Sequence, residues 1–352
     1  MTRRTWAGVL AAVLVLGLSV VALSRPVPYV TFAPGPTVNV LGKSDNKEII
    51  EISGRKTYDD NGALRLVTVI PSGPQEKVSL PGLVAGWVSP DVAVYPYRAI
   101  YQATDTRQSV KQQSSIEMVS SQDSAVAAAL AALDIPYKSG VKIASVQKGG
   151  PADGKLKTGD IVVSVDGKPV TNVDQLTSAI RPLPVGSEVA VKVRRDQTER
   201  EYTMKTTGSP QDKKKSAVLV SIAPGYQFPF DVHLNLAQNI GGPSAGMMFA
   251  LGIYDSLTPG SLTNGKVIAG TGEIDPQGKV GEIGGIQQKL VGAQDDGAKL
   301  FLVPAGNCAE AVKGHYDPDK MRLVKVNNLK DAIQDVKAWA KNPDADLPGC
   351  AA

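Results

Sequence analysis

A serine and a lysine in the C-terminal half of the chain have the surroundings that a nucleophile and its general base require. Ser244 follows Gly241, Gly242 and Pro243. Glycine permits backbone conformations and close approaches that other residues avoid, and proline suits the first turn of a helix. The almost wholly apolar run 244–257 predicts a buried helix with Ser244 at its N-terminus. Free backbone N–H groups at such a terminus can stabilise an alkoxide or an oxyanion.

Lys289 lies beside the apolar face of a second expected helix, over residues 286–296. Ile286, Leu290 and Ala293 share that face, and the lysine is adjacent to it. Burial lowers the pKa of a lysine because the charged amine loses its hydration. A neutral amine can accept the proton of a serine hydroxyl. Taken separately, a serine at a helix start is usually a cap, and a lysine at the edge of an apolar face usually extends to water.

Several separated motifs, in matching order, make residues 215–338 resemble the proteolytic domain of Lon proteases. The run 242–246 (GPSAG) resembles the nucleophile motif, and residues 271–290 resemble the segment that carries the catalytic lysine. The resemblance implies that Ser244 is the nucleophile, Lys289 the base, and Thr271 the residue whose hydroxyl orients the lysine amine. Backbone N–H groups from Gly242 to Ala245 are expected to hold the oxyanion.

The sequence departs from the Lon pattern at two places. Gly241 occupies a position that is often acidic in Lon proteases, and the strand-like segment 231–235 keeps a single histidine, His233, near the site. An alternative mechanism is a Ser-His-Asp triad with His233 or His315 as the base. A His233→Gln protein discriminates the two, because the lysine mechanism predicts that it still cleaves.

Residues 134–208 resemble a PDZ domain of the bacterial protease type. The segment 141–146 is strand-like, 149–152 (GGPA) begins a short helix, and 156–170 resembles the Gly-Asp turn, strand and hairpin of that family. PDZ domains bind an extended peptide by adding it to a sheet edge. The loop that would bind the peptide carboxylate is expected just before the strand, at Tyr137, Ser139, Gly140 and Val141.

The first residues of the chain predict a membrane anchor. Basic positions 3 and 4 precede the uncharged apolar run 6–24, which is close to the length that spans a bilayer. A secretory signal would have a shorter apolar core and a small-x-small cleavage site. Arginines before the span place the N-terminus in the cytoplasm and everything after residue 25 outside. We therefore expect a single-pass protein of the cell membrane with extracytoplasmic domains.

The rest of the sequence completes an α+β multidomain plan. Residues 26–105 are proline-rich and strand-like, with no chemistry that we can assign, and 107–133 is a helical pattern expected to pack on the protease domain. The two cysteines, Cys308 and Cys350, are expected to form one disulfide in an oxidising compartment. The expected units are 1–25 (stub and anchor), 26–133 (β-rich region and helix), 134–208 (PDZ), 209–342 (α/β proteolytic domain) and 343–352 (tail).

Charge and motifs argue against several other functions. The net charge of +4 and the low aromatic content do not favour nucleic-acid binding. Residues 149–155 spell the start of a phosphate-binding loop, but Leu156 stands where a Ser or Thr must meet magnesium. We therefore expect no nucleotide, metal or other cofactor, and protein or peptide substrates.

The whole layout resembles the membrane-anchored, PDZ-containing Lon-like proteases of bacteria. The resemblance implies an ATP-independent serine endopeptidase that degrades unfolded or flexible extracytoplasmic proteins, with the PDZ domain binding substrate or ligand peptides. A homo-oligomer is implied by the resemblance alone. The non-enzymatic alternative is a catalytically inactive PDZ adaptor on a Lon-like scaffold, which labelling of Ser244 by a serine-directed acylating probe would contradict.

Overall fold

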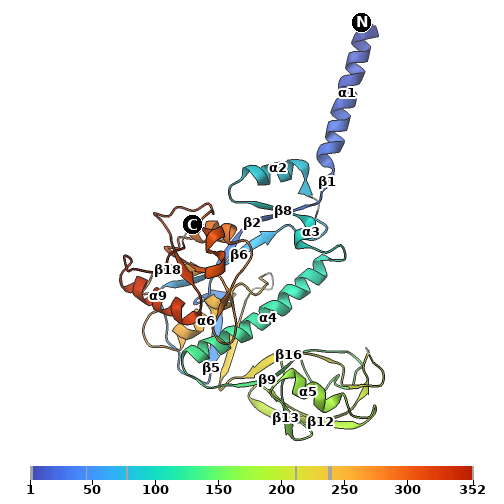
Figure 1. Cartoon of the computed structure of the whole chain (residues 1–352), viewed down its shortest axis with the longest axis vertical. Helices are drawn as coiled ribbons and strands as arrows, with labels where there is room; N and C mark the ends of the chain where they lie inside the picture. The colour runs from blue at the N-terminus through green and yellow to red at the C-terminus, as the bar shows by residue number, and fades with distance from the viewer. Residues whose placement is uncertain (1–2, 45, 77, 211, 237–239, 351–352) are drawn as a thin grey trace.

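The computed structural model describes residues 3–350 apart from 45, 77, 211 and 237–239. The chain forms a larger α/β body, a smaller β-rich lobe and a projecting N-terminal helix (Figure 1). The predicted α+β multidomain class is confirmed. Two positions of the predicted tail, 351–352, lie outside the described residues.

A six-stranded mixed sheet in the order β22-β21-β18-β6-β2-β8 lies at the centre of the larger body. Its strands are β2 Tyr29–Asn39, β6 Ala63–Pro71, β8 Ala93–Pro96, β18 Val267–Gly270, β21 Leu300–Pro304 and β22 Arg322–Val326. Strands β6, β18, β21 and β22 are parallel, and β2 is antiparallel to both of its neighbours. We predicted two separate units over residues 26–133 and 209–342. Both contribute strands to this one sheet.

Alternate side chains of this sheet face two different helical layers. Leu300 and Leu302 belong to one buried cluster, and Phe301 and Val303 belong to the other, because side chains alternate between the faces of a strand. The first face carries α4 Arg107–Ala132, α6 Gly246–Ser256 and α9 Leu329–Lys341. The second face carries α7 Ile286–Asp295 and the short α8 Cys308–Ala311.

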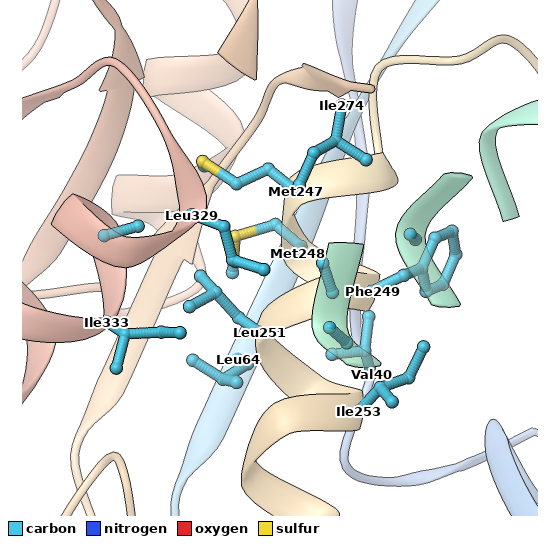
Figure 2. Packing of buried hydrophobic residues seen from close by; sticks show 14 of the residues in the cluster. Val40, Leu64, Met247, Met248, Phe249, Leu251, Ile253, Ile274, Leu329 and Ile333 are labelled. Carbon is cyan, nitrogen blue, oxygen red and sulfur yellow. The ribbon is translucent and has the colours of Figure 1, made fainter. Parts of the chain in front are cut away.

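Helix α6 is enclosed by the first layer. It is apolar over nearly its whole length, so it has no face suited to water. Figure 2 shows Met248 and Leu251 of α6 beside Leu329 of α9, and Leu64 of the sheet below them. The helical pattern predicted over 107–133 forms α4, which packs along α6. Ser244 thus directly precedes a helix in which nearly every residue is buried.

The smaller lobe is a twisted sheet in the order β13-β12-β10-β9-β16, with one helix packed on it. Its elements are β9 Lys138–Val146, β10 Ile161–Val165, β11 Lys168–Pro169, α5 Val173–Ile180, β12 Glu188–Arg195, β13 Thr198–Lys205 and β16 Val220–Gln227. One of its two edge strands, β16, follows the predicted PDZ boundary at residue 208. The lobe therefore includes residues that the sequence alone assigned to the next domain.

Short pairings join the remaining segments. They are β1 Pro26–Val27 with β7 Val78–Ser79, β3 Lys43–Ser44 with β4 Lys47–Glu48, β5 Ile50–Ser53 with β17 Asp231–Leu234, β14 Thr207–Gly208 with β15 Ser216–Ala217, and β19 Glu273–Ile274 with β20 Val280–Gly281. The short helices are α2 Leu80–Val88, α3 Tyr97–Ile100 and the 3-10 turn η1 Ala305–Asn307. Cys308 and Cys350 form a disulfide that ties the end of the described chain to α8.

The N-terminal helix α1 Arg3–Ser24 projects away from the body (Figure 1). Its segment Arg4–Val21 is long and apolar enough to cross a membrane, and none of it is buried by the rest of the described chain. By length and composition this helix is suited to be a membrane span or a signal sequence.

Candidate active site

Ser244, Lys289 and Thr271 come together in one hydrogen-bonded group. The amine Nζ of Lys289 donates to the hydroxyl Oγ of Ser244 at 2.9 Å and to Oγ1 of Thr271 at 3.0 Å. The Thr271 hydroxyl donates in turn to the backbone carbonyl of Ser244 at 3.0 Å. The three side chains that the sequence singled out therefore lie within direct contact, although they come from three separate segments.

The half-buried Ser244 lies in a turn just before α6, and not at the first helical position as predicted. Helix α6 begins at Gly246, with Ala245 as its N-cap. The carbonyl of Ser244 accepts the N–H of Gly272 at 2.8 Å, and Met247 N–H donates to the Gly272 carbonyl at 3.1 Å. These bonds hold the turn against the segment that follows β18, and they take the Ser244 carbonyl away from the helix.

Lys289 is buried on the inner side of α7, as its spacing predicted. The helix begins after Gly285, which has a left-handed φ of 68°, and only 2% of the Lys289 surface is exposed. Burial lowers the pKa of the lysine to about 7, and the negative charge of Glu273 opposes part of this shift. Near neutral pH a large fraction of the amine is therefore unprotonated and able to accept a proton.

Glu273 is a charged neighbour of the site whose role sequence reasoning did not identify. Its pKa is raised, first by burial and then by the negative charge of Glu117 on α4, while Lys289 acts in the opposite direction. It lies two residues after Thr271 on β19. The negative charge of Glu273 raises the proton affinity of the Lys289 amine.

Two serines of helix α4 hydrogen-bond to the turn that carries Ser244. The carbonyl of Ser114 accepts the N–H of Gly242 at 3.0 Å, and the hydroxyl of Ser121 donates to the carbonyl of Pro243 at 2.8 Å. Gly242 has a φ of 83°, a conformation that side chains disfavour. The sequence predicted that this helix packs on the protease domain, but nothing in its local pattern showed that it contacts the turn.

The prediction for the oxyanion donors needs a correction at Gly242. Its N–H already donates to a backbone carbonyl, so it is not free to bind a developing oxyanion in this conformation. The N–H groups of Ser244 and Ala245 donate to no acceptor within the described part of the chain. They precede α6 at the end where its dipole is positive. These two groups are the remaining candidates.

A cavity of about 420 Å³ lies against the serine and the lysine. Its other lining residues come from the segment before the serine and from two N-terminal strands: Ile240, Gly241, Pro36, Thr68, Val69, Ile70 and Pro71. Strand β18 ends at Gly270, opposite Leu66, whereas β6 continues to Pro71. Beyond Leu66, the edge of β6 that faces β18 has no strand partner among the described residues. Sequence reasoning assigned no chemistry to this region, because a strand pattern does not show what lies beside it.

Neither histidine hydrogen-bonds to the candidate nucleophile. His233 lies on β17, paired in register with Glu51 of β5, and its exposed side chain lines a cavity between the body and the lobe. His315 contacts Asp91 at 2.7 Å on the surface. The structure therefore does not place His233 in the supporting role that the resemblance implied. The histidine triad has no geometric support.

The prediction that residues 137–141 form the peptide-binding loop of the lobe is wrong. Tyr137, Ser139, Gly140 and Val141 lie in or next to β9, and β9 is an interior strand between β10 and β16. An interior strand has no free edge to accept a peptide. The Tyr137 ring packs on two other aromatic rings, and its hydroxyl lies 3.4 Å from the carbonyl of Pro276.

Of the two edge strands of the lobe's sheet, β13 and β16, the one that lies near α5 is β16. A cavity of about 680 Å³ lies between this strand and α5, lined among others by Leu176, Ile180, Val218, Val220 and Ile222. An apolar groove between a strand edge and a helix is the geometry that strand-addition recognition needs. Sequence reasoning missed it because the strand follows the rest of the lobe in the chain.

The chain is thus an α+β protein of two main parts. The larger body carries a serine, a buried lysine and a cavity, and the smaller lobe carries a groove between a strand and a helix. Comparison with known proteins identifies both parts. Residues 109–206 match the PDZ domain family, and residues 217–337 match the Lon protease (S16) C-terminal proteolytic domain family. The predicted combination of a PDZ domain with a Lon-type proteolytic domain is confirmed.

Individual relatives resemble one part or the other. The Lon protease of Mesomycoplasma hyopneumoniae is 31% identical over 118 residues, which is 30% of this chain and 13% of that protein. A probable periplasmic serine endoprotease, DegP-like, of Rickettsia conorii is 38% identical over 79 residues, which is 22% of this chain and 16% of that protein. The PDZ domain of an SdrC-like protein of Listeria monocytogenes is 19% identical, with a TM-score of 0.22, over 24% of this chain and 87% of that domain. The chain spans less than a fifth of the two curated relatives.

Proposed function

We propose that this protein is a serine endopeptidase in which Ser244 is the nucleophile and Lys289 the general base. The observation that carries the proposal is the 2.9 Å contact between the serine hydroxyl and the amine of a lysine that is 2% exposed. Because burial lowers the pKa of that amine to about 7, it can accept a proton near neutral pH.

The proposed reaction has an acylation and a deacylation half. Lys289 takes the proton of Ser244 Oγ as the oxygen attacks the peptide carbonyl, and the N–H groups of Ser244 and Ala245 receive the oxyanion. The resulting ammonium gives its proton to the leaving amine, and an acyl-enzyme remains on Oγ. Lys289 then takes a proton from water, the hydroxide attacks the ester, and the serine regains its proton. Thr271, 3.0 Å from the amine, keeps the lysine directed at the serine.

We propose that the substrate binds as an extended chain along the free edge of β6. Thr68, Val69 and Ile70 line the cavity next to the serine, on the strand edge that has no partner beyond Leu66. Addition of a strand to such an edge places the scissile carbonyl through main-chain hydrogen bonds. A chain must be locally unfolded to bind in this way, so the substrates are unfolded, flexible or small proteins. Since the chain has no complete phosphate-binding motif, we propose that cleavage needs no ATP.

We further propose that α1 anchors the protein in the cell membrane and that the groove between β16 and α5 binds peptide ends. The unburied apolar segment Arg4–Val21 supports the anchor, and the basic positions 3 and 4 at its start favour an extracytoplasmic body. The match to the PDZ family and the open strand edge support the peptide site.

Degradation of casein by the purified full-length chain tests the proposal. Wild type should cleave without ATP, and Ser244→Ala and Lys289→Met should each abolish cleavage while circular dichroism stays unchanged. His233→Gln is the matched control and should retain activity. Cleavage by a folded Lys289→Met protein would refute the lysine mechanism. If the wild type were inactive even with candidate C-terminal peptides for the PDZ groove, the protein would be better described as a catalytically inactive PDZ adaptor.

A further inference from the structure

Helix α2 Leu80–Val88 has no polar face. Its sequence, LPGLVAGWV, contains no charged residue. Leu83 and Gly86 are buried, and a Cβ added at Gly86 would lie 3.0 Å from Val94, so this side is packed against β8. The opposite side presents Val84, Trp87 and Val88, which are 47%, 61% and 79% exposed. A helix on the surface of a soluble body normally turns polar residues outward, and this one does not.

The position of α2 is fixed next to the end of α1. Strand β1, which follows α1, pairs with β7, and β7 runs directly into α2: Val27 is opposite Val78, and Ser79 is the N-cap of α2. The Trp87 ring lies against Tyr29, with centroids 6.1 Å apart. Figure 1 shows α2 at the base of α1, where the two helices are neighbours. A membrane that contained α1 would therefore end at the level of α2.

Charge at this end of the body fits a lipid headgroup layer. Arg25 follows α1 directly and is exposed, and exposed Arg98 lies in α3 Tyr97–Ile100. Tyr97, the first residue of α3, donates its N–H to the carbonyl of Pro28 at 2.9 Å, which holds α3 at the same end of the chain. Basic residues beside exposed tryptophan and valine are typical of helices that lie in the membrane interface.

We propose that the outward face of α2, formed by Val84, Trp87 and Val88, inserts into the interfacial layer of the bilayer that α1 crosses. This inference rests on the proposed membrane anchor and adds a second point of attachment to it. Two attachments, joined by the β1–β7 pairing, hold the body in one orientation on the membrane surface. A single helix followed by a flexible link would leave the body free to rotate.

Quenching of tryptophan fluorescence by labelled lipids tests this arrangement in the full chain. The protein has three tryptophans, and Trp339 is 4% exposed and lies in the core. The chain is reconstituted in vesicles of equal parts phosphatidylcholine and phosphatidylglycerol, with a quencher near the headgroup or near the end of the acyl chain. Trp6→Phe reports on Trp87, Trp87→Phe reports on Trp6, and the double variant gives the background of Trp339.

An interfacial helix inserts its apolar side by about 5–10 Å, so the shallow quencher should remove about half of the Trp87 emission and the deep quencher much less. Quenching of the Trp6→Phe protein no stronger than that of the double variant would overturn the proposal. Trp6 separates the two proposals. If it is quenched while Trp87 is not, the anchor stands and the α2 inference falls. If Trp87 alone is quenched, α2 binds the bilayer without the anchor.

Discussion

Replacement of Lys289 by methionine should make the protein inactive but more stable near neutral pH. The fold lowers the pKa of this lysine from 10.5 to about 7. Each pKa unit corresponds to about 1.4 kcal/mol, so holding the amine in its site costs the native state about 4 kcal/mol at pH 7. Methionine keeps the apolar stem and removes this cost. Loss of the contacts with Ser244 and Thr271 offsets about 1 kcal/mol.

The sign of the effect follows from proton binding. Between pH 7 and 10.5 the unfolded wild type binds more protons at Lys289 than the native state, so its unfolding free energy rises with pH over that window. The advantage of Lys289→Met is therefore largest at and below pH 7 and disappears above about 10.5. The net gain of about 3 kcal/mol at pH 7 corresponds to a rise in Tm of roughly 6–12 °C.

Thermal unfolding followed by circular dichroism from pH 6 to pH 10 measures this difference. Ser244→Ala is the matched control, because it abolishes catalysis but keeps the amine, and its Tm should stay near that of the wild type. A Lys289→Met protein no more stable than the wild type at pH 7 would show that the buried amine does not destabilise the native state. A gain that stayed constant to pH 10 would show that the amine is not held neutral by burial.

Three further predictions concern the surroundings of the dyad. The kcat/KM of the wild type should rise with pH through a midpoint near 7. Glu273→Gln should move that midpoint to lower pH because it removes the negative charge that favours the ammonium form of Lys289. An unmoved midpoint would contradict the effect of Glu273 on the lysine. Ser121→Ala should lower kcat about tenfold and leave KM nearly unchanged because the nucleophile turn loses its bond to α4, whereas Ser115→Ala, which loses only an exposed bond within the helix, should be neutral in the same assay. Gly285→Ala should cost about 1–3 kcal/mol in urea unfolding, since its φ is 68° and the new Cβ would lie 2.8 Å from a valine; Gly284→Ala meets no atom within 4 Å and should cost clearly less.

The candidate dyad could be predicted because its signals are local. The glycines and proline before Ser244 and the apolar spacing around Lys289 are each contained in about ten residues, and the separated blocks of resemblance fixed their order. The contact at 2.9 Å brings together the pair that these signals named. The exact start of α6 was missed because the Ser244 carbonyl bonds to Gly272, a partner that no helical pattern reveals.

The walls of the site could not be predicted, because they depend on long-range pairing. Strand β6 joins β18 across about two hundred residues, and its sequence shows only that it is a strand. The bonds from Ser114 and Ser121 of α4 are similarly invisible in a helical pattern. The peptide groove was assigned to β9 because the family motif was read in chain order, whereas the edge strand β16 follows the rest of the lobe.

The reactivity of Ser244 toward a serine-directed acylating probe is the sharpest test of the Ser–Lys mechanism, because it does not depend on finding the natural substrate. A single adduct on Ser244, located by mass spectrometry, is expected. Its rate of formation should rise with pH through about 7 and be lost in a folded Lys289→Met protein. Labelling at another serine, or an equal rate in Lys289→Met, would contradict the Ser–Lys mechanism.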